Sequence, residues 1–331
     1  MKIILVGLLA AASIGAAPVP PPVVPASVPA AAQADPASAE GISLALGEDR
    51  NERMTVPVSI GRDGPYPFIV DTGAERTVIA EQLAATLGLG TAGIARVHSM
   101  TEVSDIATFE IPSLQVGGKQ VRDIHAPGMD RRNLGAEGML GVDSLQQQRV
   151  SFDFARDVMT IVPSRTSEER WTDNSIVVTA KSRMGHLVLV DASVEGEKVW
   201  VIVDTGSQVT IGNTALRHKL ERRGKLKLLD AIQLLSVTGG RASADASLVK
   251  HMRLGGVDIY DMPVAFSDVH PFKKLGLTDR PALLLGMDAL KLFERVSVDF
   301  ANRRVRLLAK GHSERAPSAR LAAATAGRKR G

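Results

Sequence analysis

The spacing of apolar and polar residues predicts β-strands along most of the chain. Met54–Ile60 alternates between apolar and polar residues, and a glycine-containing turn then leads to an apolar run that ends at Val70. Leu187–Val194 is followed in the same way by a glycine-containing turn and an apolar run that ends at Val203. We therefore predict that each half of the chain begins with a β-hairpin.

Two further landmarks follow each hairpin in the same order. Gly-Met-Leu-Gly-Val-Asp-Ser-Leu at 138–145 matches Leu-Leu-Gly-Met-Asp-Ala-Leu at 284–290. Val-Ser-Phe-Asp-Phe at 150–154 matches Val-Ser-Val-Asp-Phe at 296–300. Each copy then ends in a predicted closing strand, Val158–Val162 or Val305–Leu308. Landmarks that recur in one order indicate that a domain has been duplicated within the chain.

Few helices are predicted between these strands. Helix-like segments cover Glu81–Leu87 and Ala215–Arg223. Short helices are also expected after Asp143 and Asp288, which we interpret as N-caps. The second copy has a longer interior, around His270–Arg280. The whole pattern predicts an all-β protein with a few short helices and two copies of one fold.

The N-terminus is typical of a secretory signal peptide. Lys2 precedes the apolar stretch Ile3–Ala17, and small residues follow it. Because a membrane span needs about 20 apolar residues, we predict cleavage near Ala17 and no membrane span in the mature chain. An uncleaved anchor is the alternative. The protein is expected to be exported, either to the periplasm or out of the cell.

Composition also suggests the domain boundaries. Proline and alanine dominate residues 18–44, which is typical of a semi-rigid tether, and a polar stretch separates the two copies. The predicted organisation is a signal peptide at 1–17, a tether at 18–44, a first lobe at 45–163, a linker at 164–173, a second lobe at 174–309 and a basic disordered tail at 310–331.

Charge and composition exclude several functional classes. The net charge is +4, but residues 310–331 hold six basic side chains and one acidic side chain and so carry +5, which leaves −1 for the rest. A nucleic-acid partner is therefore not expected. The absence of cysteine excludes disulfides and thiol catalysis, and the seven histidines lack the spacing of metal ligands. We expect neither a metal nor another cofactor.

The candidate chemistry lies where each hairpin ends. Asp-Thr-Gly-Ala at 71–74 and Asp-Thr-Gly-Ser at 204–207 each place a carboxylate after an apolar strand, followed by a glycine that lets the backbone turn sharply. If the two copies face each other, both carboxyls can reach one water molecule. Two like charges at that distance share a proton, so one acid can serve as general base while the other donates. For either Asp alone, a turn-capping role is the alternative.

These motifs, with the later hydrophobic-Leu-Gly-x-Asp-x-Leu segments, resemble the aspartic peptidase family. Each copy is similar to the retroviral, single-lobe form, and the whole resembles bacterial secreted proteins in which two retropepsin-like domains are fused. The resemblance covers about residues 45–309. It implies the acid-protease fold, with two retropepsin-like β-barrel lobes related by pseudo-twofold symmetry. It also implies an aspartic endopeptidase whose partner is a polypeptide substrate.

By this resemblance Asp71 and Asp204 are the catalytic pair, one from each lobe. Thr72 and Thr205 are expected to interlock the two loops through hydrogen bonds from hydroxyl to backbone. This interlock would hold the carboxyls coplanar before substrate arrives. The remaining residues expected to support these loops are Gly73, Ala74, Gly206 and Ser207.

The fourth residue of the motif differs between the copies. Ser207 is expected to donate its hydroxyl to Asp204, which Ala74 cannot do for Asp71. Because the loss of a donor to a carboxylate raises the pKa, we expect activity to extend toward neutral pH.

The resemblance further implies a flap in each lobe, a hairpin that covers the substrate. In the second copy Ser236–Arg241 is the candidate, with Thr238, Gly239 and Gly240 at its tip. In the first copy the flap is expected at about Val97–Ala107, a segment that contains no glycine.

Two other functions are weighed against the peptidase. A catalytically silent peptide-binding protein of the same fold would hold peptides without cutting them, and the two intact motifs argue against it. A glycoside hydrolase also uses paired carboxylates, but it needs them farther apart and usually an aromatic platform for the sugar. The chain contains two Trp and two Tyr, so this reading is disfavoured.

The assembly also has two possible forms. The linker at 164–173 leaves room for the lobes to pair within one chain. We therefore expect a monomer that forms an intramolecular pseudo-dimer, in which each lobe supplies one Asp. The alternative is that each lobe pairs with its counterpart on another molecule.

Overall fold

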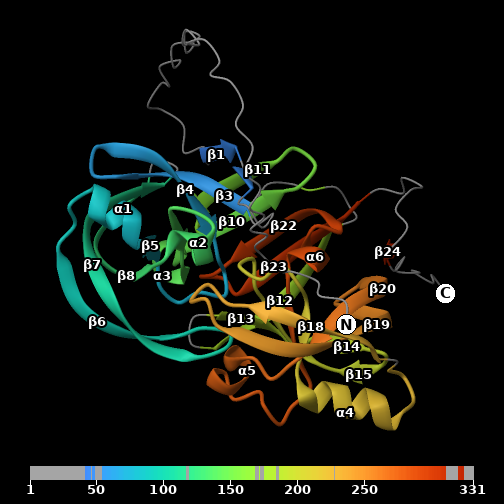
Figure 1. Cartoon of the computed structure of the whole chain (residues 1–331). Helices are drawn as coiled ribbons and strands as arrows, with labels where there is room; N and C mark the ends of the chain where they lie inside the picture. Colours follow the sequence, from blue (N-terminus) through green and yellow to red (C-terminus); the bar gives the residue numbers. More distant parts are fainter. Residues whose placement is uncertain are drawn as a thin grey trace, which may run out of the picture.

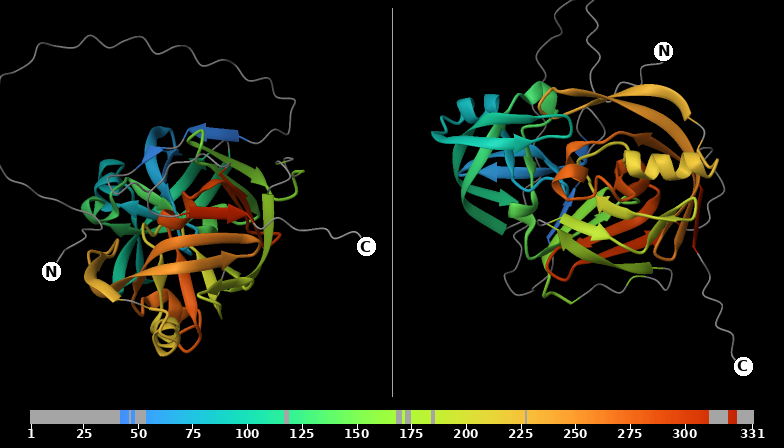
Figure 2. Two further views of the ribbon diagram at one scale, coloured as in Figure 1. Left: turned by 90° about the vertical axis from the view of Figure 1, so that its right-hand side faces the viewer. Right: turned by 90° about the horizontal axis from the view of Figure 1, so that it is seen from below.

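The computed structural model of the chain (Figure 1) describes residues 42–45, 47–48, 54–116, 119–167, 171, 175–183, 186–226, 228–310 and 320–323. Most of these residues form β-strands, and six short helices lie among them. In Figures 1 and 2 the first copy, coloured blue to green, lies beside the second, coloured yellow to red. The predicted all-β fold with two lobes is confirmed.

The first lobe is built on one sheet of eight strands in the order β2-β3-β4-β9-β5-β8-β7-β6. Its strands are β2 (Gly47–Glu48), β3 (Met54–Ile60), β4 (Asp63–Val70), β5 (Val78–Ala80), β6 (Thr91–His98), β7 (Val103–Val116), β8 (Lys119–Met129) and β9 (Gly138–Leu140). Its helices are α1 (Glu81–Thr86), α2 (Arg131–Leu134) and α3 (Val142–Leu145). β3 and β4 form the predicted first hairpin, with Val56 opposite Phe68.

The second lobe repeats this plan. Its strands are β12 (Ser175–Arg183), β13 (His186–Leu189), β14 (Ala192–Val194), β15 (Glu197–Lys198), β16 (Trp200–Val203), β17 (Ile211–Gly212), β18 (Leu228–Leu235), β19 (Arg241–Leu254), β20 (Val257–Phe266) and β21 (Ala282–Leu285). Its helices are α4 (Thr214–Arg222), α5 (His270–Lys274) and α6 (Met287–Leu290). The single strand predicted at Leu187–Val194 is divided in two, because β13 pairs with β16 whereas β14 pairs with β19.

In both lobes, the strand that leads to the Asp pairs in parallel with a strand much later in the chain. Val70 of β4 lies opposite Leu140 of β9, and Val203 of β16 lies opposite Leu285 of β21. β5 and β17 pair antiparallel with β9 and β21 respectively. This shared topology is what a duplicated domain predicts, and it fixes each Asp at the end of a buried strand.

The last strands of the two lobes join in one sheet. These strands are β10 (Gln148–Asp153), β11 (Val158–Pro163), β22 (Phe293–Asp299) and β23 (Arg304–Ala309), and the order runs β1-β11-β10-β22-β23-β12. β10 and β22 are equivalent in the two copies and pair antiparallel, with Ser151 opposite Ser297 and their hydroxyls 2.8 Å apart. A local twofold axis therefore relates the lobes at this pair of serines.

Two strands lie where the sequence predicts a tether and a tail. β1 (Ile42–Ala45) pairs with β11, and β24 (Arg320–Ala323) pairs with β20. Both extend the edge of a sheet whose backbone groups would otherwise be unpaired. These two segments of the chain are therefore β-strands. The predicted signal peptide, residues 1–17, lies outside the described residues.

The two longer predicted helices are present as α1 and α4, within one residue at each end. The N-cap predictions for Asp143 and Asp288 are wrong. α3 and α6 have Gly141 and Gly286 as N-caps, and the two aspartates lie in the first turn. The sequence pattern predicts neither α2 nor α5, and α5 lies in the longer interior of the second copy.

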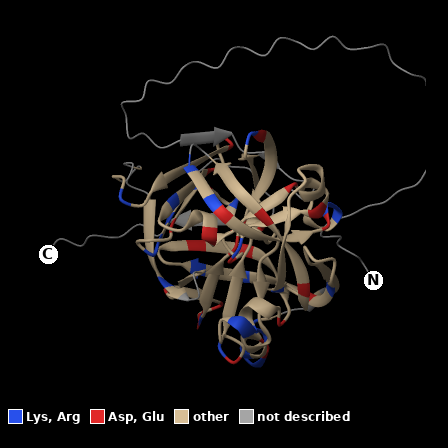
Figure 3. Ribbon diagram, turned by 90° about the vertical axis from the view of Figure 1, so that its left-hand side faces the viewer, with Lys and Arg blue, Asp and Glu red and all other residues tan. Residues whose placement is uncertain are grey.

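One large apolar core runs through both lobes, and two smaller clusters lie beside the ends of β4 and β16. Ile69 and Met139 belong to the cluster in the first lobe, and Ile202 and Leu284 to that in the second. Basic and acidic residues are interspersed along the ribbon on the face shown in Figure 3. Among the described residues, no helix has the length and apolar character needed to cross a membrane.

Candidate active site

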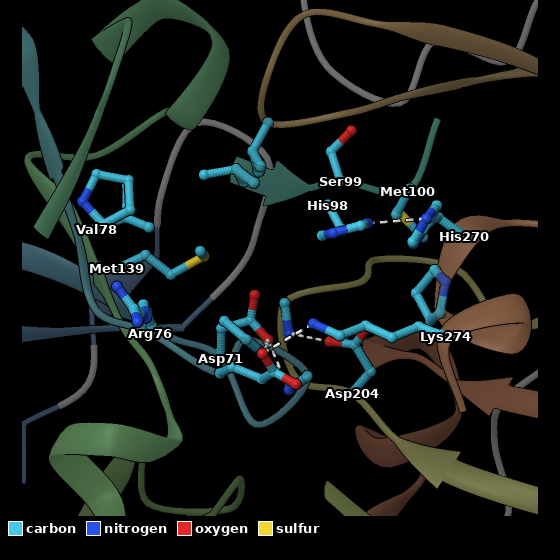
Figure 4. A pocket seen from close by; sticks show the side chains of 18 of the residues that line it. Asp71, Arg76, Val78, His98, Ser99, Met100, Met139, Asp204, His270 and Lys274 are labelled. Atoms are coloured by element: carbon cyan, nitrogen blue, oxygen red, sulfur yellow. Dashed lines mark hydrogen bonds and ion pairs between the residues drawn. The ribbon is translucent and has the colours of Figure 1, made fainter. Parts of the chain in front are cut away.

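Asp71 and Asp204 lie at the ends of β4 and β16, where the two lobes meet. The Asp71 N–H donates to the Leu140 carbonyl at 3.0 Å, and the Asp204 N–H donates to the Leu285 carbonyl at 3.1 Å. The parallel strands β9 and β21 thus hold both residues as the chain leaves the sheet. Figure 4 shows the two carboxyls side by side, and they are hydrogen-bonded to each other. The structure therefore brings together the two acids that the sequence singles out.

Thr72 and Thr205 connect the two loops across the lobe interface. Thr72 Oγ1 donates to the Val203 carbonyl at 2.9 Å and accepts from the Thr205 N–H at 3.1 Å. Thr205 Oγ1 donates to the Val70 carbonyl at 2.6 Å and accepts from the Thr72 N–H at 3.0 Å. Both threonines are buried, so water does not compete for these bonds. This arrangement is the interlock expected from the sequence.

Gly73 and Gly206 are required because each lies against the carboxyl of the opposite lobe. A Cβ atom on Gly73 would lie 2.5 Å from Asp204 Cγ, and one on Gly206 would lie 2.1 Å from Asp71 Oδ2. Real Cβ atoms essentially never approach other atoms closer than 3.0 Å. Only glycine at these two positions lets the carboxyls come together.

Each loop also donates two backbone hydrogen bonds to its own carboxyl. The donors are the N–H groups of Gly73 (2.7 Å) and Ala74 (3.0 Å) to Asp71 Oδ1, and of Gly206 (2.9 Å) and Ser207 (3.2 Å) to Asp204 Oδ1. Such bonds favour a charged carboxylate and fix its orientation. All four predicted support residues thus contact the acid of their own loop.

The expected role of the Ser207 hydroxyl is wrong. This hydroxyl donates to the Val209 carbonyl at 2.8 Å, and only the backbone of Ser207 contacts Asp204. A hydroxyl has one proton to donate, and here the turn after Asp204 uses it. The Ser/Ala difference between the copies therefore does not change the donors to the two carboxyls in the predicted way.

Burial raises the pKa of Asp204 well above its usual range. The residue is 8% exposed, and the negative charge of Asp71 and the hydrogen bond to its side chain raise the pKa further. The N–H groups of Gly206 and Ser207 oppose this effect. Two carboxyls in such contact hold one proton between them.

Asp143 and Asp288 bind the segments that follow the two Asp-Thr-Gly loops, instead of capping helices. Asp143 accepts from the Thr77 N–H at 2.9 Å and the Thr77 hydroxyl at 2.7 Å. Asp288 accepts from the Thr210 N–H at 2.9 Å and the Thr210 hydroxyl at 2.7 Å. Each aspartate thus ties the segment after its loop to the late Leu-Gly segment. Burial raises the pKa of Asp288 to about 6.

A cavity of about 550 Å³ lies in front of the paired carboxyls. The first lobe contributes apolar side chains that include Val78, Met129 and Met139, and the second lobe contributes Ile202 and Leu284. Figure 4 shows Val78 and Met139 on one side of the carboxyls and Lys274 on the other. A cavity with apolar walls and a few polar groups is typical of ligand-binding sites.

Both predicted flaps are present as hairpins. β6 and β7 form the first, and β18 and β19 form the second. Val97 of the first flap and Val237 of the second line the cavity. A Cβ atom on Gly240 would lie 2.2 Å from Thr101 Oγ1, so the two tips are in contact. The predicted tip residues Thr238, Gly239 and Gly240 form the turn of the second flap.

A charged cluster beside Asp71 is absent from the sequence predictions. Glu75 forms an ion pair with Lys274 at 2.8 Å and lies 3.7 Å from His186 Nε2. The cluster spans the lobe interface, because Glu75 belongs to the first lobe and both partners belong to the second. The signal that could have indicated it is the fourth residue after each Asp, which is Glu75 in one copy and Gln208 in the other.

The structure also pairs two histidines that are far apart in the sequence. His98 Nδ1 of the first flap lies 3.0 Å from Nε2 of His270, the first residue of α5, and the His270 N–H donates to the Met100 carbonyl. Their separation of 172 positions in the sequence explains why sequence spacing gives no sign of this contact. Within the described part of the chain, no group of three His, Asp or Glu residues is arranged to hold a metal ion.

Comparison with protein families gives two matches that do not overlap. Residues 56–147 match the family model described as the aspartyl protease of gag polyproteins, and residues 190–289 match the model described as aspartyl protease. The first match contains Asp71 and the second contains Asp204. No curated protein matches the chain.

Proposed function

Because the chain consists largely of two retropepsin-like aspartyl protease domains in tandem, we propose that it is an aspartic endopeptidase that hydrolyses peptide bonds. The observation that supports this most directly is the contact between Asp71 and Asp204, one from each domain. The cavity in front of them supplies space for a polypeptide.

In this proposal the two carboxyls activate one water molecule between them. The ionised carboxyl takes a proton from the water, whose oxygen attacks the carbonyl carbon of the peptide bond. The protonated carboxyl donates its proton to the carbonyl oxygen, which gives a tetrahedral intermediate. The carboxyl that took the water proton then gives it to the amide nitrogen, and the C–N bond breaks with release of the amine. The other carboxyl takes a proton from a hydroxyl of the intermediate as the product acid forms, so the pair again holds one proton. The buried hydrogen bonds of Thr72 and Thr205 hold the carboxyls in place before substrate arrives.

Activity is expected to extend toward neutral pH. The raised pKa of Asp204 means that this carboxyl keeps its proton at a higher pH than an exposed aspartate does. The form of the pair with one shared proton, which the mechanism requires, therefore persists to higher pH. The pKa is raised by burial and by the charge of Asp71, and not by the lack of a hydroxyl at Ala74 that the sequence suggests as the cause. A rate confined to pH below about 4 would contradict this expectation.

The substrate is proposed to be an extended polypeptide in the cavity between the lobes. Its backbone would pair with the flap hairpins, which allows many sequences to bind. We also propose that the chain acts as a monomer. Its N-terminal sequence further suggests that it is exported. No observation favours the catalytically silent alternative, so it enters only as an outcome of the experiment.

The experiment is turnover of a quenched fluorescent peptide library, with binding of a statine-type transition-state mimic measured in parallel. Wild type should cleave and bind, and Asp71→Asn and Asp204→Asn should each abolish cleavage. Asp63→Asn, an exposed aspartate in the first hairpin, is the control and should leave cleavage unchanged. Binding of the mimic without any turnover would instead establish a silent peptide-binding protein. If wild type shows no turnover and does not bind the mimic, the proposal is refuted.

A further inference from the structure

The surroundings of the two aspartates differ in charge. Four residues after the Asp, the first loop carries Glu75 and the second carries Gln208. Glu75 binds Lys274 Nζ at 2.8 Å through one oxygen, and its other oxygen lies 3.7 Å from His186 Nε2. A cluster of ionisable groups therefore stands beside Asp71, whereas the matching position after Asp204 holds a neutral amide. The internal duplication makes this difference visible, because the second copy serves as a reference for the first.

His186 is the buried member of this cluster. It begins β13 of the second lobe, is 5% exposed and lines the cavity next to the first loop. Burial lowers the pKa of the imidazole, and Lys274 acts in the same direction. The carboxylates of Glu75 and Asp71 favour the protonated ring. The ring is therefore neutral near pH 7 and gains its charge in acid, within the electrostatic reach of Asp71.

The other charges in the cluster largely cancel. Lys274 and Glu75 are joined in an ion pair, so together they contribute little net charge at Asp71. A protonated His186 therefore adds positive charge beside Asp71.

On the basis of the proposed function, we propose that His186 is a positioning residue that, once protonated in acid, makes the two aspartates unequal, holding the negative charge on Asp71 and leaving the shared proton on Asp204. A cation close to a carboxylate stabilises its ionised form. Asp204 is 8% exposed, and burial favours its protonated form. Asp71 then accepts the proton from the attacking water, and Asp204 donates its own proton to the carbonyl oxygen of the peptide.

The test is the pH profile of kcat/KM for His186→Gln, which removes the titrating charge but keeps a polar side chain of similar length. The low-pH limb should move up by about one pH unit, because an opposite charge at short range lowers a carboxyl pKa by about 1–3 units. The high-pH limb should stay in place, because the wild-type ring is neutral there. His125→Gln, at an exposed histidine on β8, is the matched control and should give the wild-type profile.

Two outcomes would overturn the inference. One is a His186→Gln profile that coincides with that of wild type. The other is a fall by one constant factor at every pH with the fold intact, which would indicate a purely structural role. In either case the turnover by wild type would leave the proposed function standing.

A second measurement does not depend on the folding of the His186 variant. The imidazole of His186 can be titrated by NMR in wild type and in Asp71→Asn, which loses the carboxylate but keeps its shape. The pKa of His186 should fall in Asp71→Asn, because coupling between two titrating groups is reciprocal. An unchanged pKa would refute the coupling. This measurement needs no turnover, so it separates failure of the inference from failure of the proposed function.

Discussion

Replacement of Thr205 by valine tests whether the cross-lobe interlock organises the paired carboxyls. Thr205 is fully buried, and its hydroxyl donates to the Val70 carbonyl at 2.6 Å and accepts from the Thr72 N–H at 3.0 Å. Valine keeps the shape of threonine but removes both bonds, so a carbonyl and an N–H of the first lobe lose their partner in a buried position. An unsatisfied buried polar group costs about 1–3 kcal/mol, so the free energy of unfolding should fall by about 2–6 kcal/mol.

The assays are denaturant unfolding and peptide turnover. Turnover should fall by about 100-fold even where the variant is folded, because a displacement of about 1 Å between reacting groups has that effect. Thr205→Ser keeps the hydroxyl and is the control, with a stability loss of about 1 kcal/mol from the missing methyl group. If Thr205→Val unfolds at the wild-type denaturant concentration and cleaves at the wild-type rate, the four cross-lobe bonds do not organise the site.

Three further predictions follow from the site and the lobe interface. Gly206→Ala should abolish turnover, because its Cβ would lie 2.1 Å from Asp71 Oδ2, whereas Gly90→Ala, where a Cβ meets no atom within 4 Å, should cleave normally. Folding raises the pKa of Asp288 to about 6, so its contribution to stability is greatest below pH about 4 and is lost as the pH rises through 6. Between pH 4 and 7 the free energy of unfolding should therefore fall by about 2–3 kcal/mol more in wild type than in Asp288→Asn. An equal pH dependence in the two proteins would contradict the assignment. An equimolar mixture of Asp71→Asn and Asp204→Asn should remain inactive in the peptide assay, because β10 and β22 pair the lobes within one chain; recovered activity would mean that lobes of different chains pair.

Much of the fold follows from local sequence because the duplication repeats each signal. The alternation in Met54–Ile60 and the apolar runs before Asp71 and Asp204 predict the strands that carry the acids. The predicted helix at Glu81–Leu87 corresponds to α1. Periodicity and turn residues determine such elements through neighbours that are close in sequence. The division of Leu187–Val194 into β13 and β14 could not be predicted in this way, because it depends on which distant strand each part pairs with.

Local patterns also gave wrong roles where a side chain could choose between near and distant partners. Asp143 and Asp288 precede helical segments, so capping was a natural prediction, yet their carboxylates bind Thr77 and Thr210. Ser207 lies next to an acid in the sequence, but its hydroxyl bonds to the turn at Val209. In each case the competing partner is placed by the packing of two segments that the sequence leaves unrelated.

The sequence by itself determined that two equivalent Asp-Thr-Gly loops exist and that each follows a buried strand. Only the tertiary structure decided that their carboxyls touch, because that contact depends on the cross-lobe pairing of β10 with β22 and on the bonds of Thr72 and Thr205. It alone decided that the lobes differ around the acids, since His186 and Lys274 reach Glu75 from the other half of the chain. Contacts between distant segments set the burial and charge around a side chain, and these quantities have no local signature in the sequence.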